Sequence, residues 1–209
     1  PKGKAFDGVV YGFATIGDGV LAATSQGLLW GAANGRSWTT APAAVRDEYH
    51  YVAAAKGNVV AASLSAVELS NDGGGSWRNV TVPPEVTQVT ALAVDAQGGV
   101  WLGGRDGVFY TADAGASWKP MKDLYLRNPD CIFFDQAKNR MLVTSSGPGT
   151  AAFAVQLPSM QVTWWDTGWN LRFVRPIGDH LIAGTLFDGI VVQPRMVASP
   201  VPVATAGAR

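Results

Sequence analysis

The octapeptide Ser70-Asn71-Asp72-Gly73-Gly74-Gly75-Ser76-Trp77 recurs as Thr111-Ala112-Asp113-Ala114-Gly115-Ala116-Ser117-Trp118, and a partial copy runs from Gly31 to Trp38. Its glycines permit the positive φ of a tight turn, and its Asp and Ser or Thr side chains can hydrogen-bond backbone N–H groups inside that turn. Its tryptophan offers a large apolar side chain to a neighbouring unit. The motif therefore predicts a braced turn and a packed indole, with structural roles for Ser70, Asp72, Gly74, Trp77, Thr111, Asp113, Gly115 and Trp118.

The spacing of the tryptophans indicates a repeat. Trp38 and Trp77 are 39 residues apart, Trp77 and Trp118 are 41 apart, and Trp164 follows after 46. A period near forty with strand-type sequence between the motifs is typical of propeller blades. We expect an all-β fold, a β-propeller of four-stranded antiparallel blades with five blades. The alternative is part of a larger six- to eight-bladed ring.

The repeat predicts one domain over residues 1–196. Its units span approximately residues 8–42, 49–82, 87–120, 128–165 and 170–196. The fourth unit lacks the motif, and the fifth shows no outer strand of its own. Residues 1–7 are either a frayed end or an outer strand donated to the last unit, and the Ala/Pro/Val-rich residues 197–209 read as a flexible tail.

The two full motifs resemble the Asp-box (BNR) repeat, which occurs in sialidases, in sortilin-type receptors and in the photosystem II stability/assembly-factor-like propellers. The style of the motif is most similar to that of the sortilin-type and assembly-factor-like propellers. The resemblance covers two of five units, and it implies a non-enzymatic scaffold for protein interaction. It further implies an assembly or accessory subunit, outside the cytoplasm, whose protein partner belongs to a membrane-associated complex.

Composition argues against several other functions. The 16 basic and 16 acidic residues cancel, so no electrostatic footprint for nucleic acid exists. No apolar run is long enough to span a membrane. Cys131 is the only cysteine, which excludes an internal disulfide, and it reads as a buried small hydrophobe. His50 and His180 lack partners at ligand spacing, and no phosphate or dinucleotide motif occurs, so we expect neither metal nor cofactor.

The links between blades and the bends between second and third strands should share one face, opposite the motif turns. That face is rich in Arg, Tyr and Trp, the side chains that dominate protein contacts. The candidate binding residues there are Arg46, Asp47, Tyr49, His50, Arg105, Asp106, Tyr125, Arg127, Trp169, Arg172 and Asp188.

The alternative function is a carbohydrate-active enzyme or lectin with a central pocket, such as a sialidase-like glycosidase. Asp106 and Asp188 occupy equivalent bends and could form a carboxylate pair, beside Tyr125 and Trp169 as a sugar platform. Each Asp, however, precedes a Gly, which is the common hairpin-turn dipeptide. A sialidase also requires an arginine triad and a Phe-Arg-Ile-Pro motif, of which residues 173–176 hold only a scrambled version. We therefore assign no catalytic residue.

Overall fold

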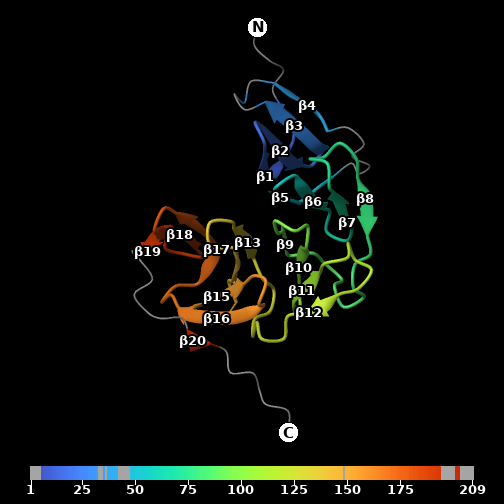
Figure 1. The fold of residues 1–209 in the computed structure, drawn as a ribbon. Helices are drawn as coiled ribbons and strands as arrows, with labels where there is room; N and C mark the ends of the chain where they lie inside the picture. Colours follow the sequence, from blue (N-terminus) through green and yellow to red (C-terminus); the bar gives the residue numbers. More distant parts are fainter. Residues whose placement is uncertain are drawn as a thin grey trace.

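The structure is a computed structural model that describes residues 6–32, 35, 37–41, 48–147 and 149–193, together with the backbone of 201–202. Throughout these residues the regular structure is β-strand, arranged as five antiparallel sheets around a common axis (Figure 1). The described residues thus form an all-β β-propeller of five blades, which confirms the predicted fold class and the five repeat units of this chain.

Each sheet is built from strands that follow one another along the chain. The first sheet contains β1 (Val10–Ile16), β2 (Gly19–Thr24), β3 (Gly27–Ala32) and β4 (Trp38–Thr40). The second contains β5 (Tyr51–Ala55), β6 (Asn58–Ala62), β7 (Val67–Ser70) and β8 (Arg78–Val80). The third contains β9 (Ala91–Val94), β10 (Val100–Gly104), β11 (Gly107–Thr111) and β12 (Lys119–Pro120).

The last two sheets depart from this four-stranded plan. The fourth contains β13 (Cys131–Asp135), β14 (Arg140–Thr144), β15 (Ala151–Gln156) and β16 (Gln161–Asp166), and β20 (Val201–Pro202) pairs with the outer edge of β16. The fifth has three described strands, β17 (Leu171–Ile177), β18 (His180–Thr185) and β19 (Ile190–Gln193). The β20 pairing falls within the segment expected to be a tail, whose other residues, 197–200 and 203–209, lie outside the described residues.

The core is divided among the interfaces between consecutive sheets. Among the described residues, four hydrophobic clusters occur, and each joins one sheet to the next. The innermost strands β1, β5, β9, β13 and β17 likewise contact one another in sequence order. Alternate residues of a strand point to opposite faces of the sheet, so a strand between two neighbours buries both its faces. This explains why every residue of β10 is buried.

The motif turns are braced by their own side chains. In the second sheet, Asp72 Oδ1 accepts hydrogen bonds from the Ser70 hydroxyl at 2.7 Å and from the Ser76 N–H at 2.9 Å. Ser70 Oγ accepts from the Gly74 N–H at 2.8 Å, where φ is +95°. The third sheet repeats these contacts through Asp113, including an acceptance from the Ser117 N–H at 2.8 Å. The turns are therefore held locally, as their composition predicts.

The indoles of the two full motifs pack against the preceding sheet. Trp77 joins the cluster between the first and second sheets, and its Nε1–H donates to the Gly74 carbonyl at 3.1 Å. Trp118 joins the cluster between the second and third sheets, and its Nε1–H donates to the Thr81 carbonyl of the second sheet at 2.6 Å. Gly115 approaches Thr81 so closely that a Cβ atom would lie 3.0 Å from its backbone.

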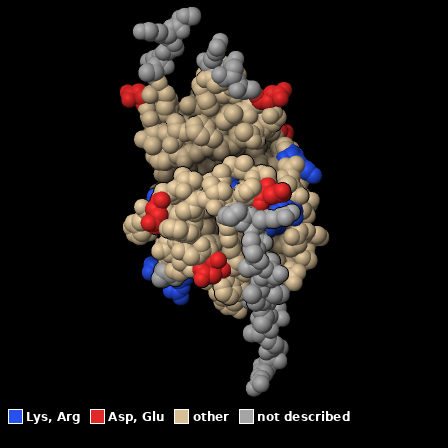
Figure 2. Space-filling model, turned by 90° about the vertical axis from the view of Figure 1, so that its left-hand side faces the viewer, with Lys and Arg blue, Asp and Glu red and all other residues tan. Residues whose placement is uncertain are grey.

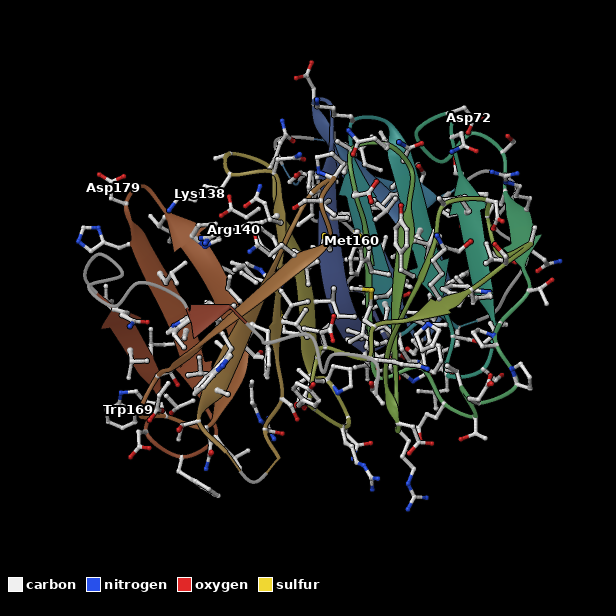
Figure 3. The ribbon with its side chains drawn as sticks, turned by 60° about the horizontal axis from the view of Figure 1, so that its bottom comes forward. Asp72, Lys138, Arg140, Met160, Trp169 and Asp179 are labelled. Atoms are coloured by element: carbon white, nitrogen blue, oxygen red, sulfur yellow. The ribbon has the colours of Figure 1, made fainter. Side chains whose placement is uncertain are left out.

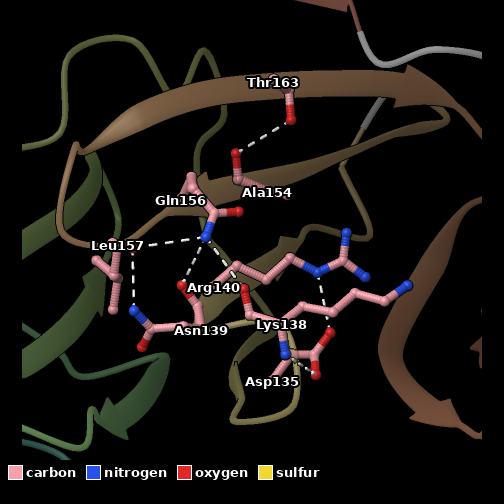
Figure 4. A network of polar contacts seen from close by, with 8 residues as sticks. All are labelled: Asp135, Lys138, Asn139, Arg140, Ala154, Gln156, Leu157 and Thr163. Atoms are coloured by element: carbon pink, nitrogen blue, oxygen red, sulfur yellow. Dashed lines mark hydrogen bonds and ion pairs between the residues drawn. The ribbon is translucent and has the colours of Figure 1, made fainter.

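The fourth sheet, which lacks the motif, is braced by a different network (Figure 4). Arg140 Nε donates to Asp135 Oδ2 at 2.9 Å, and this ion pair at the hairpin between β13 and β14 is buried. Gln156 Nε2 donates to the carbonyls of Lys138 at 3.0 Å and Asn139 at 3.1 Å. A long-range polar network thus replaces the local turn contacts of the second and third sheets.

The spacing of the tryptophans does not identify the packed indole of the fourth sheet. Trp164 is a partly exposed residue of β16, whereas the adjacent Trp165 is buried in the cluster between the fourth and fifth sheets. Because neighbouring residues of a strand face opposite sides, the sequence spacing identified the strand but not the packed indole.

The described part of the N-terminal segment lies against the first sheet, and not against the last. Gln26 Nε2 donates to the Asp7 carbonyl, and the Phe6 ring lies over Gly8. The alternative that residues 1–7 close the fifth sheet is therefore wrong for Phe6 and Asp7. Residues 1–5 lie outside the described residues.

Candidate functional site

The two ends of the propeller differ in what they present (Figure 3). Asp72 in the motif turn, Lys138 in the β13–β14 hairpin and Asp179 in the β17–β18 turn lie toward one face. Trp169, in the link between the fourth and fifth sheets, lies at the opposite face. The links between sheets therefore lie away from the braced turns, and we call the face that holds them the link face.

The link face holds a cavity of about 570 Å³ between the third and fourth sheets, which we call the link groove. It brings together three of the predicted residues, Asp106, Tyr125 and Arg127. Its full lining is Asp106, Lys122, Leu124, Tyr125, Leu126, Arg127, Asn128, Ser145, Gly147, Gly149, Ala151 and Phe153. Tyr125 is 67% exposed, so an aromatic ring stands free beside side chains of both charges.

The long link between β12 and β13, residues 121–130, is fixed to the sheets on both sides. The Asn128 N–H donates to the Arg105 carbonyl in the β10–β11 turn at 3.1 Å. The Ser145 hydroxyl lies within hydrogen-bond distance of the carbonyls of Arg127 at 2.7 Å and Asn128 at 3.1 Å. Leu124 is buried beneath the link and anchors it to the core. The groove wall is therefore preorganised, which reduces the entropy lost on binding.

A second group of polar and aromatic side chains gathers where the inner strands begin. The Tyr11 hydroxyl donates to Glu48 Oε1 at 2.7 Å, and this bond to a carboxylate raises the pKa of Tyr11. The Tyr11 ring stacks on His50 with 4.4 Å between ring centroids. Burial, together with the charge of Asp130, raises the pKa of Tyr51. Tyr11 and Tyr51 were not among the predicted binding residues, although both lie at the start of inner strands of the repeat.

The remaining predicted residues are dispersed. Arg105, Arg172 and Asp188 are exposed, but they do not line the link groove. Trp169 lines a separate apolar cavity of about 210 Å³, together with Trp165 and strands of the fifth sheet. Arg46 and Asp47 lie outside the described residues.

The prediction that Tyr49 is a surface residue was wrong. Its side chain is completely buried between the first and second sheets, and its hydroxyl donates to the buried Glu68 carboxylate. Its backbone N–H also donates to the Thr24 carbonyl at 3.0 Å, and this hydrogen bond attaches the link between the first two sheets to the first sheet. Tyr49 therefore belongs to the core.

The proposed carboxylate pair is not brought together in either cavity. Asp106 lines the link groove, whereas Asp188 lines neither cavity, and its N–H donates to Thr185 Oγ1 at 2.7 Å within a turn. Among the described residues, no three His, Cys, Asp or Glu side chains are grouped so as to hold a metal. In the same part of the chain, no helix is long and apolar enough to cross a membrane.

The fold and this face define the class of the protein, a five-bladed β-propeller with a preorganised groove on its link face. A comparison with models of protein families found no match, and a comparison with curated proteins found none either.

Solved structures share the fold. The chain is similar to one in the crystal structure of a nidogen/laminin complex, with a TM-score of 0.73 and 12% identity over 93% of this chain and 79% of that one. It is similar to YCF48 bound to D1 peptide, with a TM-score of 0.67 and 12% identity over 93% and 69%. It is also similar to the GH74 enzyme of Niastella koreensis, with a TM-score of 0.74 and 17% identity over 94% of this chain and only 30% of that one. At these identities the likeness concerns the fold alone.

Proposed function

We propose that the chain is a non-enzymatic protein-binding module and that its link groove receives an extended segment of a partner protein. The observation that carries this proposal is the groove itself, because a free tyrosine and an arginine stand on a wall fixed to both neighbouring sheets. Tyr and Arg are enriched among the residues that dominate binding energy at protein interfaces. Rigid loops on a propeller are suited to present them.

Two of the similar structures support this class of function. One is a chain of a nidogen/laminin complex and the other is YCF48 bound to D1 peptide, so both similar structures are complexes of proteins or peptides. From the resemblance of the two full motifs to the Asp-box repeat, we further propose that the chain acts as an assembly or accessory subunit outside the cytoplasm, with a membrane-associated complex as its partner.

The test measures how tightly purified variants bind the captured partner protein, where each variant carries two alanine substitutions on one face of the propeller. We expect Tyr125→Ala/Arg127→Ala to lose at least about tenfold in affinity, since interface anchors cost about 1.4 kcal/mol or more when truncated. The matched control, Lys138→Ala/Asp179→Ala on the opposite face, should bind like the unchanged chain. Equal loss in both variants, or in neither, would refute the link groove as the binding site.

The competing carbohydrate function has one observation in its favour, the similarity to a GH74 enzyme. It predicts hydrolysis of an aryl glycoside or binding of an oligosaccharide that disappears in Asp106→Ala/Asp188→Ala. We expect neither activity, because Asp188 lines neither of the two cavities described above. Hydrolysis that depends on both residues would overturn the protein-binding proposal.

A further inference from the structure

The first sheet leaves one apolar face uncovered. Ile16 of β1 packs against the cluster between the first and second sheets, so Phe13, three residues earlier in the strand, points the other way and is 61% exposed. Trp38 lies on the same side, 41% exposed, with its ring centroid 6.3 Å from that of Phe13. Two large aromatic rings thus cover a face with no neighbouring sheet among the described residues.

The fifth sheet also leaves one apolar face uncovered, the face that points away from the fourth sheet. Leu181 and Val191 point toward the fourth sheet. Ile190 and Val192 therefore point away from it, and they are 64% and 55% exposed. Ile177 at the end of β17 is also exposed. Exposed aliphatic side chains that gather on one sheet face commonly mark an interface.

A hollow separates these two faces. Figure 2 shows it between the part of the molecule that carries the first sheet and the part that carries the fifth, bordered mainly by uncharged residues. Within the described residues, hydrophobic clusters join the first sheet to the second and the fourth to the fifth, and none joins the fifth to the first. The ring is therefore open at this sector.

The interfaces between the described sheets show which side chain packs against such an apolar face. Trp77 projects from its turn toward the preceding sheet, where it meets the cluster around Leu21. Trp38 has the same local geometry, since its Nε1–H donates to the Gly35 carbonyl at 3.1 Å just as Trp77 Nε1–H donates to Gly74. The indole of Trp38 therefore points to the position that a preceding sheet would occupy. No sheet of the described residues lies there.

We propose that a sixth four-stranded antiparallel sheet of the same repeat, carried on the same polypeptide, occupies this sector. It would present an apolar surface to Phe13 and Trp38, and its own indole to Ile190 and Val192. The matched chains in the nidogen/laminin and YCF48 structures are longer than the parts that this chain covers, which are 79% and 69% of them. Chains of this fold can therefore carry more residues than the five sheets described here.

A second copy of the chain fits the sector less well. The first sheet of each copy is already packed against its own second sheet. If the first sheet of one copy entered the sector of another, that attached second sheet would collide with the first sheet of the host. The sector requires a sheet with two free faces, which a repeat unit at the end of the array provides.

Thiol labelling of single cysteines in a Cys131→Ser background tests the proposal. Phe13→Cys and Ile190→Cys report on the two faces, and Leu64→Cys on an exposed site away from the sector is the control. In the 209-residue chain we expect all three thiols to react at similar rates. A second chain carries a copy of its own residues 91–130 grafted ahead of Phe6. In that chain we expect the labelling rates of Phe13→Cys and Ile190→Cys to fall by a factor of about ten or more, with the rate of Leu64→Cys unchanged.

Three results would overturn the proposal. Fast labelling of both positions in a folded grafted chain would show that a sixth sheet does not fit. Slow labelling of both positions in the monomeric 209-residue chain would show that the ring closes on itself, and slow labelling in a dimer, seen by analytical ultracentrifugation, would show that a second copy fills the sector.

A second variant keeps the test decisive if the grafted chain does not fold. Oxidised Phe13→Cys/Ile190→Cys forms an intramolecular disulfide only if the two Cα atoms come within about 7 Å. We expect no such disulfide in the 209-residue chain, because no hydrophobic cluster of the described residues joins the fifth sheet to the first. Its formation would refute the proposal without any graft.

Discussion

The third and fifth sheets differ in how their strands are buried. Strand β10 of the third sheet is buried on both faces, whereas strand β19 of the fifth is partly buried on one face only. β10 and β19 are both apolar in sequence, yet β10 is buried throughout, whereas Ile190 and Val192 of β19 are exposed. The third sheet shares hydrophobic clusters with two others, whereas among the described residues the fifth shares one only with the fourth. Apolar sequence thus marks a strand as suitable for burial, and its neighbours decide whether burial occurs.

The largest expected effect lies at the centre of the third sheet. Trp101 is completely buried, and its Nε1–H donates to Asp95 Oδ2 at 3.2 Å. We expect Trp101→Ala to lower the free energy of unfolding by about 3–5 kcal/mol, because it leaves a large cavity. In the fifth sheet, Ile190→Ala should cost less than about 0.5 kcal/mol. Urea unfolding of both variants checks the contrast, and equal losses would contradict it.

The next contrast concerns equivalent indoles. Trp77→Ala should lower the free energy of unfolding by about 2–4 kcal/mol, since the indole packs between two sheets. Trp38→Ala should cost less than about 1 kcal/mol in the 209-residue chain, because its indole meets no preceding sheet. Thermal unfolding gives both values. A cost for Trp38 that matches Trp77 would show that its indole is covered in solution.

A smaller effect is expected from the braced turns. Thr111 Oγ1 accepts from the Gly115 N–H at 2.9 Å and donates to Asp113 Oδ1 at 2.6 Å, and the residue is buried. Thr111→Val keeps the shape but removes these bonds, so we expect a loss of about 1–2 kcal/mol. Thr39→Val on the exposed strand β4 is the matched control and should change stability by less than about 0.5 kcal/mol.

Acid should weaken the second and third sheets through the same turns. Hydrogen bonds from Ser117 and Thr111 lower the pKa of Asp113 from 3.8 to about 2, and bonds from Ser76 and Ser70 lower the pKa of Asp72 still further. A depressed folded-state pKa contributes stability above the unfolded pKa and loses it as the pH falls through the folded value.

We therefore expect the melting temperature to fall between about pH 4 and pH 2. Asp113→Asn should reduce the melting temperature at neutral pH and flatten this part of the profile. An unaltered profile in Asp113→Asn would show that the turn does not depend on the charged carboxylate.

Local chemistry made much of the fold predictable. The turns at Asp72 and Asp113 are braced within a few residues, so their sequence carries the whole interaction. The fourth sheet was harder, because its brace joins Gln156 to the carbonyls of Lys138 and Asn139 across the sheet. The burial of Trp165 in place of Trp164 depended on strand parity, which spacing alone does not give.

The candidate site was predictable only in part. Asp106, Tyr125 and Arg127 were identified because links and bends of the repeat meet at one face. Their shared groove depends on the contact of Ser145 with the Arg127 carbonyl, 18 residues apart, which no sequence pattern encodes. Tyr49 was misplaced because a polar link suggested solvent, whereas its ring enters the interface between two sheets.

The sequential packing of the sheets has a mechanical consequence. Each hydrophobic cluster of the described residues joins two consecutive sheets, so the described molecule should behave as a one-dimensional array. Opening should then start at the first and fifth sheets and travel inward, and the amides of β9 and β10 should exchange with solvent last. Pulling on the two ends would peel the array sheet by sheet, with the link groove, between the third and fourth sheets, among the last features to be lost.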